Sequence, residues 1–428
     1  MKCEHNRCIP YSPKPLAMKI LLSAYACEPN KGSEPGVGWN WTQALLKQGH
    51  AVHLLTRSNN RASVEAALSL QQVKPTTAYY DLPRWCQRWK HWPGGIYLYY
   101  LLWQIGAYRR AAMLHATEKF ERVHHITFAS FRQPSFMGRL GIPFIFGPVG
   151  GGEEMPRIFR KGIPLTGRLL EALRNIGNRL TFIDPLMLST FSSASLVACT
   201  TSDTLKRIPA RFHRKCIVLP TIGIEEAEIA APSSNTVSEP RFLFVGRLIY
   251  WKGVHLALRA LAQVRRSVPL ASLRVIGDGR DAEWLKNIAS DCGVADAVEW
   301  LPSMPHDEIL REYASNTSFL FPSLHDSGGM VVLEALARGL PVICLNLGGP
   351  GAIVTPSCGI LIDAHQQGEA EVVASLAQAM IRLATDAATR NNLSANAISR
   401  ARELTWERAA QAIHSSACLD RAPVQSAR

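Results

Sequence analysis

The sequence lacks several features that would place it in common classes of protein. No apolar run is long enough to span a bilayer, so no transmembrane helix is predicted. The ten cysteines form no Cys-x-x-Cys motif and no zinc-type Cys/His spacing, and a reducing compartment is the default for such thiols. Asp-x-Asp is absent as well, so we expect neither a metal site nor a metal-bridged diphosphate.

The glycine fingerprint of dinucleotide-binding proteins is also missing. Gly36 and Gly38 follow a predicted strand, Lys19–Ala26, but no third glycine comes three residues later. A nicotinamide dehydrogenase would need that third glycine and an acid downstream of it. The sequence therefore disfavours a dehydrogenase.

Charge is distributed unevenly along the 428 residues, which are enough for two domains with separate cores. Residues 1–221 contain 29 Lys and Arg against 12 Asp and Glu, whereas the remainder contains 18 against 22. A basic half next to a near-neutral half predicts that the first half meets an anionic surface or acceptor. A basic surface that serves only solubility is the alternative.

Residues 317–347 contain the most informative pattern in the chain. The apolar run Ser318–Phe321 and the run Val342–Leu345 predict two buried strands. Between them, Met330–Arg338 has apolar residues at helical spacing, and Gly339 stands where a left-handed residue would end that helix. This is a strand–loop–helix–strand unit of an open parallel sheet.

In such sheets, ligands bind beyond the carboxyl ends of the strands. Here that place is the loop of Asp326, Gly328 and Gly329, at the start of the predicted helix, where backbone N–H groups favour phosphate. Glu334 follows about one turn into the helix. Two acids beside a phosphate-binding helix start fit a ligand with both phosphates and hydroxyls, such as a nucleotide sugar.

The stretch PS-x-x-Asp-x-Gly-Gly-x-x-x-x-Glu-Ala-x-Ala-x-Gly-x-Pro-Val resembles the donor-site signature of the retaining glycosyltransferases of family 4. The chain is similar to their exopolysaccharide-type bacterial members, glycosyl transferases group 1. Asp326 replaces the commoner Glu, and Ser327–Gly328 stands for the usual Gly–Phe. The resemblance implies an α/β fold of the GT-B type, with two doubly wound Rossmann-like domains facing across a cleft.

The resemblance also implies roles for single residues of the second half. Asp326 would lie near the sugar and Glu334 would bind ribose hydroxyls, both counted as catalytic. Further donor-binding positions come from the same loop, from a Gly–Arg–Leu…Lys–Gly element that would hold the diphosphate, and from a loop on the nucleoside side. They are Gly328, Gly329, Met330, Val331, Arg247, Lys252, Gly277 and Gly279.

In the first half, glycine-rich turns and a histidine attract attention. Gly36 and Gly38 match a loop that meets donor phosphates in the family, although a plain tight turn also explains them. His124 matches a strand-end histidine that would hydrogen-bond the transferred sugar. If the register of the strand differs by one residue, His125 would take this place. A histidine with a purely structural role is the more common alternative. Gly150, Gly151 and Gly152 end another strand and predict contact with the acceptor, with a hinge as the alternative.

Composition changes near residue 222, where an acidic and then small polar stretch is typical of a linker. With the resemblance, the predicted organisation has five parts. They are a disordered extension (1–17), an acceptor-binding Rossmann-like domain (18–222), a linker (223–240), a nucleotide-sugar-binding Rossmann-like domain (241–403), and a terminal helix crossing back to the first domain (404–420).

Aromatic and basic residues alternate between Trp85 and Arg110. Such a segment suits a helix lying in a membrane interface, with Trp89, Trp92 and Trp103 seated in it, and a buried helix with a basic rim explains it equally well. The first interpretation leads to a peripheral enzyme on the cytoplasmic face of the inner membrane that uses a lipid-linked glycan acceptor.

The resulting hypothesis is a metal-independent, retaining hexosyltransferase. It would move a sugar from a UDP- or GDP-sugar to a hydroxyl of a glycan, in exopolysaccharide or cell-surface polysaccharide synthesis, with no cofactor beyond the nucleotide-sugar co-substrate. A transferase or synthase acting on a soluble sugar is the nearest alternative. A nucleic-acid-binding protein would fit the charge but leaves Asp326 and Glu334 unexplained, so we expect no nucleic-acid partner.

Overall fold

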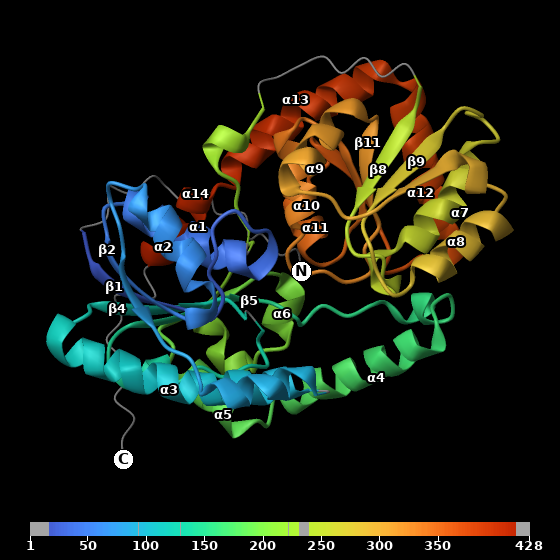
Figure 1. The fold of residues 1–428 in the computed structure, drawn as a ribbon. Helices are drawn as coiled ribbons and strands as arrows, with labels where there is room; N and C mark the ends of the chain where they lie inside the picture. Colours follow the sequence, from blue (N-terminus) through green and yellow to red (C-terminus); the bar gives the residue numbers. More distant parts are fainter. Residues whose placement is uncertain (1–16, 93, 129, 221, 231–238, 417–428) are drawn as a thin grey trace.

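The computed structural model describes residues 17–92, 94–128, 130–220, 222–230 and 239–416, which form two parallel α/β units on either side of a cleft (Figure 1). The predicted fold class, two Rossmann-like domains of the GT-B type, is confirmed. Residues 1–16 of the predicted extension and residues 231–238 of the predicted linker lie outside the described residues, and the domain boundaries stay a prediction. No helix in the described ranges is long and apolar enough to cross a membrane.

The first half is built on a seven-stranded parallel sheet in the order β3-β2-β1-β4-β5-β6-β7. Its strands read as nearly continuous apolar runs because helices cover both faces of the sheet. The strands are β1 (Lys19–Ala24), β2 (Ala51–Thr56), β3 (Thr76–Tyr79), β4 (Arg122–Ile126), β5 (Phe144–Val149), β6 (Leu196–Cys199) and β7 (Cys216–Val218). The helices are α1 (Ser33–Lys47), α2 (Arg61–Ser69), α3 (Gly95–Glu118), α4 (Leu165–Leu180), α5 (Pro185–Ser193) and α6 (Ser202–Lys206).

The second half has a six-stranded parallel sheet in the order β10-β9-β8-β11-β12-β13. The strands are β8 (Arg241–Val245), β9 (Ser272–Ile276), β10 (Val298–Leu301), β11 (Ser318–Phe321), β12 (Val342–Leu345) and β13 (Gly359–Ile362). The helices are α7 (Val254–Val264), α8 (Ala282–Asp291), α9 (His306–Glu312), α10 (Met330–Ala337), α11 (Gly348–Ile353), α12 (Glu369–Thr385), α13 (Ala387–Glu403) and α14 (Trp406–His414).

Short 3-10 helices connect several of these elements. They are η1 (Ser58–Asn60), η2 (Arg84–His91), η3 (Met137–Leu140), η4 (Arg157–Arg160), η5 (Ala210–Lys215), η6 (Glu226–Glu228), η7 (Tyr250–Lys252), η8 (Ala295–Ala297) and η9 (Tyr313–Ser315).

Helix α14 follows the second sheet in sequence but packs on the first half, against α1. Trp406 and Ile413 are buried in the same apolar cluster as Trp41 of α1 and Leu22 of β1. The end of the chain therefore completes the core of its first half.

The aromatic segment divides into a buried and an exposed part. Tyr99, Tyr100 and Trp103 face the core and are fully buried, which corrects the prediction that Trp103 seats in a membrane interface. Its indole N–H donates to the carbonyl of Tyr80 at 3.0 Å, so the ring is fixed inside the protein. Trp85 and Trp92, by contrast, are each 62% exposed.

Buried neutral histidines should make the fold sensitive to acid. His255 on α7 is fully buried, and its pKa is lowered to about 3 by burial and by nearby Arg259. Below the ordinary value of 6.5 the unfolded chain binds a proton that the folded chain does not, so stability falls as the pH falls. Each such residue should remove about 2 kcal/mol of unfolding free energy between pH 7 and pH 5.

Urea unfolding at the two pH values would test this expectation. His255→Leu should reduce the difference between them by about 2 kcal/mol, because leucine binds no proton. His91→Gln, at an exposed position, is the control and should leave the difference unchanged. A His255→Leu protein with the pH dependence of the wild type would contradict the prediction.

Candidate functional site

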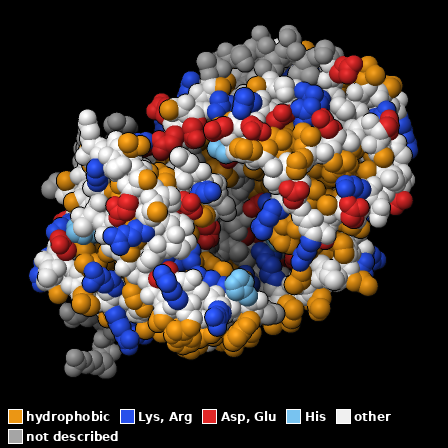
Figure 2. Space-filling view, in the orientation of Figure 1, with side chains coloured by type: hydrophobic (Ala, Val, Ile, Leu, Met, Phe, Trp, Pro, Cys, Tyr) orange, Lys and Arg blue, Asp and Glu red, His pale blue; other side chains and the backbone are white. Residues whose placement is uncertain are grey.

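A cavity of about 920 Å³ lies between the two halves. Figure 2 shows the hollow, with Lys and Arg side chains on its right-hand wall. The first half lines it with Gly32, Glu34, Val37, Ile96, Tyr97, Phe128, Ser130, Arg132, Gly150, Gly151 and Thr200. Ile222 and the second half complete it with Arg247, Lys252, His306, Ile309, Asp326, Ser327, Gly328, Gly329, Met330, Val331 and Glu334.

The start of α10 forms part of the cavity wall. Gly329 precedes the helix with φ of 88°, a left-handed conformation that glycine adopts without strain. Met330 and Val331 in the first turn also line the cavity. The positive end of the helix dipole is therefore directed at the space where an anionic ligand would sit.

Two cations come from the loop that follows β8. Lys252 forms an ion pair with Asp326, and its ammonium lies 4.9 Å from the centre of the Phe321 ring. The guanidinium of Arg247 also lines the cavity and has no hydrogen bond or ion pair to any described residue. Since Asp326 already neutralises part of the Lys252 charge, Arg247 is the one of these two cations that can bind an anion without first giving up a partner.

Glu334 is a buried carboxylate at the edge of the cavity. Its Oε2 accepts a hydrogen bond from the Tyr313 hydroxyl at 3.0 Å, and its Oε1 lies 3.9 Å from Nδ1 of His306. Burial raises the pKa of Glu334, while His306 and the Tyr313 hydroxyl act in the opposite direction. Oε1 is the oxygen left to accept hydrogen bonds from a ligand.

The turn after β5, which was predicted to contact the acceptor, lies between two cavities. Gly150 and Gly151 line the cavity, whereas Gly152 lines a neighbouring one. The backbone N–H of Gly151 donates to Oγ of Ser327 at 2.9 Å, and that hydroxyl also bonds the buried carboxylate of Glu153. The donor loop of the second half thus touches the predicted acceptor loop of the first.

A second contact between the halves is made by a buried carboxylate of α4. Oε1 of Glu171 bonds Nε2 of His325 at 2.8 Å and the Tyr250 hydroxyl at 3.0 Å. Burial raises the pKa of Glu171, but His325, Arg174 and the Tyr250 hydroxyl together outweigh it, so the pKa is lowered overall. His325 and Asp326 are neighbours in sequence, so this contact helps to position the donor loop.

The structure corrects the prediction for His124. Its ring is fully buried, with Nδ1 at 3.1 Å from Nε2 of His414 and Nε2 at 2.7 Å from the carbonyl of Gly147. His125 is buried as well and bonds the Tyr100 hydroxyl at 3.0 Å. Neither ring lines the cavity, because β4 ends at Ile126 and the chain reaches the cleft only at Phe128.

Four predicted donor-site glycines also lie outside the cavity lining. Helix α1 begins at Ser33, so Gly36 and Gly38 lie inside a helix and not in the turn before it. A Cβ on Gly38 would lie 2.0 Å from the carbonyl oxygen of Ala26, which explains that glycine by close packing. Gly277 and Gly279 are similarly close to the backbone of the loop after β8.

The structure adds residues that the sequence analysis did not single out. Glu34, at the start of α1, accepts a hydrogen bond from the backbone N–H of Phe128 at 2.9 Å, and both line the cavity. Arg132, His306 and Ser327 join them from separate segments. Only Ser327 had a sequence signal, its place in the donor signature. Among the described residues, no three His, Cys, Asp or Glu side chains are grouped to hold a metal ion.

Comparison with known proteins agrees with this geometry. The family model "Glycosyl transferases group 1" matches residues 226–400. The chain is 32% identical to D-inositol 3-phosphate glycosyltransferase of Corynebacterium diphtheriae, over 50% of this chain and 53% of that protein. It is 36% identical to glycogen synthase of Mycobacterium tuberculosis, over 28% of this chain and 29% of that protein. The chain thus spans about half, or less, of the curated relatives it matches.

Solved structures are similar over nearly the whole chain. Sucrose-phosphate synthase from Thermosynechococcus elongatus superposes with a TM-score of 0.61 and 18% identity, over 93% of this chain and 97% of that one. WaaG, a glycosyltransferase involved in lipopolysaccharide biosynthesis, gives 0.58 and 18%, over 93% and 100%. At such identities the likeness establishes the fold alone. Residues 226–400 therefore match the glycosyl transferases group 1 model, within a chain that has the GT-B fold.

Proposed function

We propose that this protein transfers a sugar from a UDP- or GDP-sugar to a hydroxyl of a glycan acceptor, with retention at the anomeric carbon. The observation that carries the proposal is the cleft itself. Arg247, Lys252, the start of α10 and Glu334 meet there across from the Gly150–Gly151 turn. Cations and a helix start suit the diphosphate, and a carboxylate suits ribose hydroxyls.

In the proposed reaction, the bond between the anomeric carbon and the diphosphate oxygen breaks while the acceptor oxygen bonds that carbon from the same face. The acceptor proton passes to the leaving diphosphate oxygen, so atoms and charge balance without a protein nucleophile. Arg247, Lys252 and the N–H groups of α10 stabilise the negative charge that develops on the diphosphate. Asp326, released from Lys252 or shared with it, lies near the sugar.

A panel of UDP-, GDP- and ADP-sugars would test the donor part. We expect slow hydrolysis of one donor in the absence of acceptor, because water can enter a cleft of this size. No hydrolysis or binding of any nucleotide sugar would overturn the proposal.

The reaction should not need a metal ion, because protein cations are available for the charge that metals meet elsewhere. Activity is therefore expected to persist in excess EDTA at about its original rate. The control is the same assay with magnesium or manganese added back. Complete loss in EDTA, restored by either metal, would show that a metal bridges the diphosphate.

For the acceptor we propose a lipid-linked glycan of exopolysaccharide or cell-surface polysaccharide synthesis, met at the cytoplasmic face of a membrane. The excess of basic residues in the first half and the exposed indoles of Trp85 and Trp92 support this choice. A soluble acceptor is the second candidate, favoured by the relatives named for inositol 3-phosphate.

Liposome sedimentation separates the two candidates. Arg84 and Arg88 are exposed beside Trp85, so binding to anionic vesicles should appear at low salt and weaken as salt rises. Changing both arginines to serine should reduce the partition coefficient about 30-fold, at roughly 1 kcal/mol per charge near the surface. The matched control changes Arg266 and Arg402, exposed arginines of the second half. Protein that stays in the supernatant at low salt would favour the soluble acceptor.

A further inference from the structure

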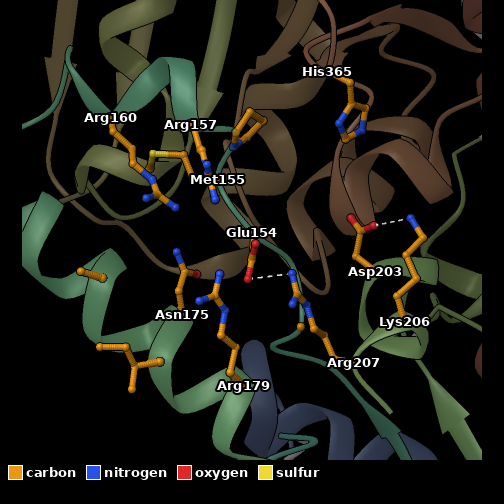
Figure 3. Close-up of a pocket in the computed structure, with 14 residues that line it drawn as sticks. Glu154, Met155, Arg157, Arg160, Asn175, Arg179, Asp203, Lys206, Arg207 and His365 are labelled. Atoms are coloured by element: carbon orange, nitrogen blue, oxygen red, sulfur yellow. Dashed lines mark hydrogen bonds and ion pairs between the residues drawn. The ribbon is translucent and has the colours of Figure 1, made fainter. Parts of the chain in front are cut away.

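A second cavity, of about 500 Å³, lies beside the cleft and is lined by residues of the first half and by His365 of the second. Figure 3 shows side chains entering it from the η4 segment, from α4 and from α6. Gly152 lines this cavity while Gly150 and Gly151 line the cleft, so a single turn separates the two spaces.

The cavity has an excess of positive charge. Five cations line it, against two carboxylates, Glu154 and Asp203. Both carboxylates are already engaged, Glu154 with Arg207 at 2.7 Å and Asp203 with Lys206 at 3.0 Å. The three remaining cations have no carboxylate partner among the described residues; they are Arg157, Arg160 and Arg179.

One hydrogen-bond donor in the cavity is also unsatisfied. Nε of Arg160 is buried and has no hydrogen-bond partner among the described residues. Arg157 and Arg179 point toward the same space from η4 and α4 (Figure 3). An anion with several oxygens could accept hydrogen bonds from more than one of these guanidinium groups. Phosphate and diphosphate have that chemistry.

Helix α4 carries an exposed apolar row that reaches the cavity. The row repeats every three or four residues, and its members are Leu165, Leu169, Leu173, Ile176 and Leu180. Leu165 is 76% exposed, and Ile176 belongs both to the row and to the cavity lining. Hydrophobic side chains gather along the lower edge of the molecule in Figure 2, where Figure 1 draws α3, α4 and α5.

We infer that this cavity binds the phosphate or diphosphate head of a lipid-linked acceptor, whose hydrocarbon lies on the apolar row of α4. The inference rests on the proposed function in taking the ligand as acceptor. The two features suit opposite ends of one amphiphile. The arginines without a carboxylate partner would bind its anionic head, and the exposed leucines would bind its hydrocarbon chain. A sugar linked to that head would extend past the Gly150–Gly152 turn toward the cleft.

Calorimetric titration with two probes, inorganic pyrophosphate and farnesyl diphosphate, tests the inference. Farnesyl diphosphate should bind about 100-fold more tightly, the effect of burying a few methylene groups on the row. Replacing Arg157 and Arg179 with glutamine should lower the affinity for both probes about tenfold or more. The double change Leu169→Ser with Leu173→Ser should reduce the affinity for farnesyl diphosphate to that for pyrophosphate. All four positions are exposed, so the fold should tolerate the changes.

Matched controls are Arg266→Gln and Leu270→Ser, exposed residues of the second half that should change neither affinity. Equal affinity for the two probes, or full affinity after the arginine changes, would overturn the inference. Vesicles of phosphatidylglycerol form a third arm. If the arginine variant no longer binds these vesicles but still binds farnesyl diphosphate, the cavity recognises a membrane headgroup and the acceptor assignment is wrong.

Titration with UDP keeps this inference distinct from the proposed function. UDP binding that is lost in Lys252→Ala assigns the nucleotide to the cleft. If UDP binds there and farnesyl diphosphate fails, only the second site is overturned. If no nucleotide diphosphate binds, the donor proposal fails whatever the second cavity does.

Discussion

Replacing Lys252 with alanine should lower the turnover number about 10²- to 10³-fold, the usual cost of removing one group that stabilises charge in a transition state. The ammonium lies in the cleft, paired with Asp326 and held beside the Phe321 ring. Without it, Asp326 would stand unpaired next to the incoming diphosphate and would repel it. The effect should therefore appear both in turnover and in donor affinity.

Lys286→Ala on α8 is the matched control, since that lysine is exposed and pairs only with Glu283. Its activity should equal that of the wild type. The circular dichroism spectrum of Lys252→Ala should match that of the wild type, because Lys252 lines the cleft and belongs to neither sheet. A folded Lys252→Ala protein with normal turnover would rule out the phosphate role.

Changing Glu334 to glutamine should reduce kcat/KM for the donor about 10²-fold, because a neutral amide accepts hydroxyl hydrogen bonds less strongly than a carboxylate. The fold should persist, since Gln can still accept from the Tyr313 hydroxyl. Removing a buried charge whose pKa is already raised should not destabilise the protein.

Two further variants separate ligand binding from support of the carboxylate. Tyr313→Phe removes only the hydroxyl that holds Oε2 and should lower kcat/KM a few-fold. Glu283→Gln, at an exposed position of α8, should have no effect. If Tyr313→Phe were as damaging as Glu334→Gln, the carboxylate would serve structure rather than the donor.

The elements around the donor loop of the second half could be predicted from local sequence patterns. The strand Ser318–Phe321, the helix starting at Met330 and the left-handed Gly339 are all where periodicity and end signals put them. The donor loop lies between them, so Asp326 and Glu334 reach the cleft as the spacing predicted. Short-range geometry sufficed here because each of these positions is fixed by its own neighbours in the chain.

The remaining features of the site depend on contacts between residues far apart in the sequence, and local sequence patterns do not predict such contacts. His124 stands at the predicted strand, but whether its ring faces the cleft depends on α14, which fills the space beside it with His414. The pairs Glu171–His325 and Glu153–Ser327 join residues more than 150 positions apart. Helix α4 was missed because its exposed leucines resemble an ordinary core face until the structure shows them uncovered.

The position of α14 gives the chain a particular order of assembly. Arg122 of the central strand β4 donates to the carbonyl of His414 at 2.8 Å, so the first sheet depends on residues that are synthesised after the second sheet. Trp406 closes the apolar surface of α1 only after the whole second half has left the ribosome. During translation the first half must wait with that surface open, where it is exposed to chaperones and to other unfinished chains. Helix α14 therefore couples the stability of the half that is made first to a segment that is made after the second half.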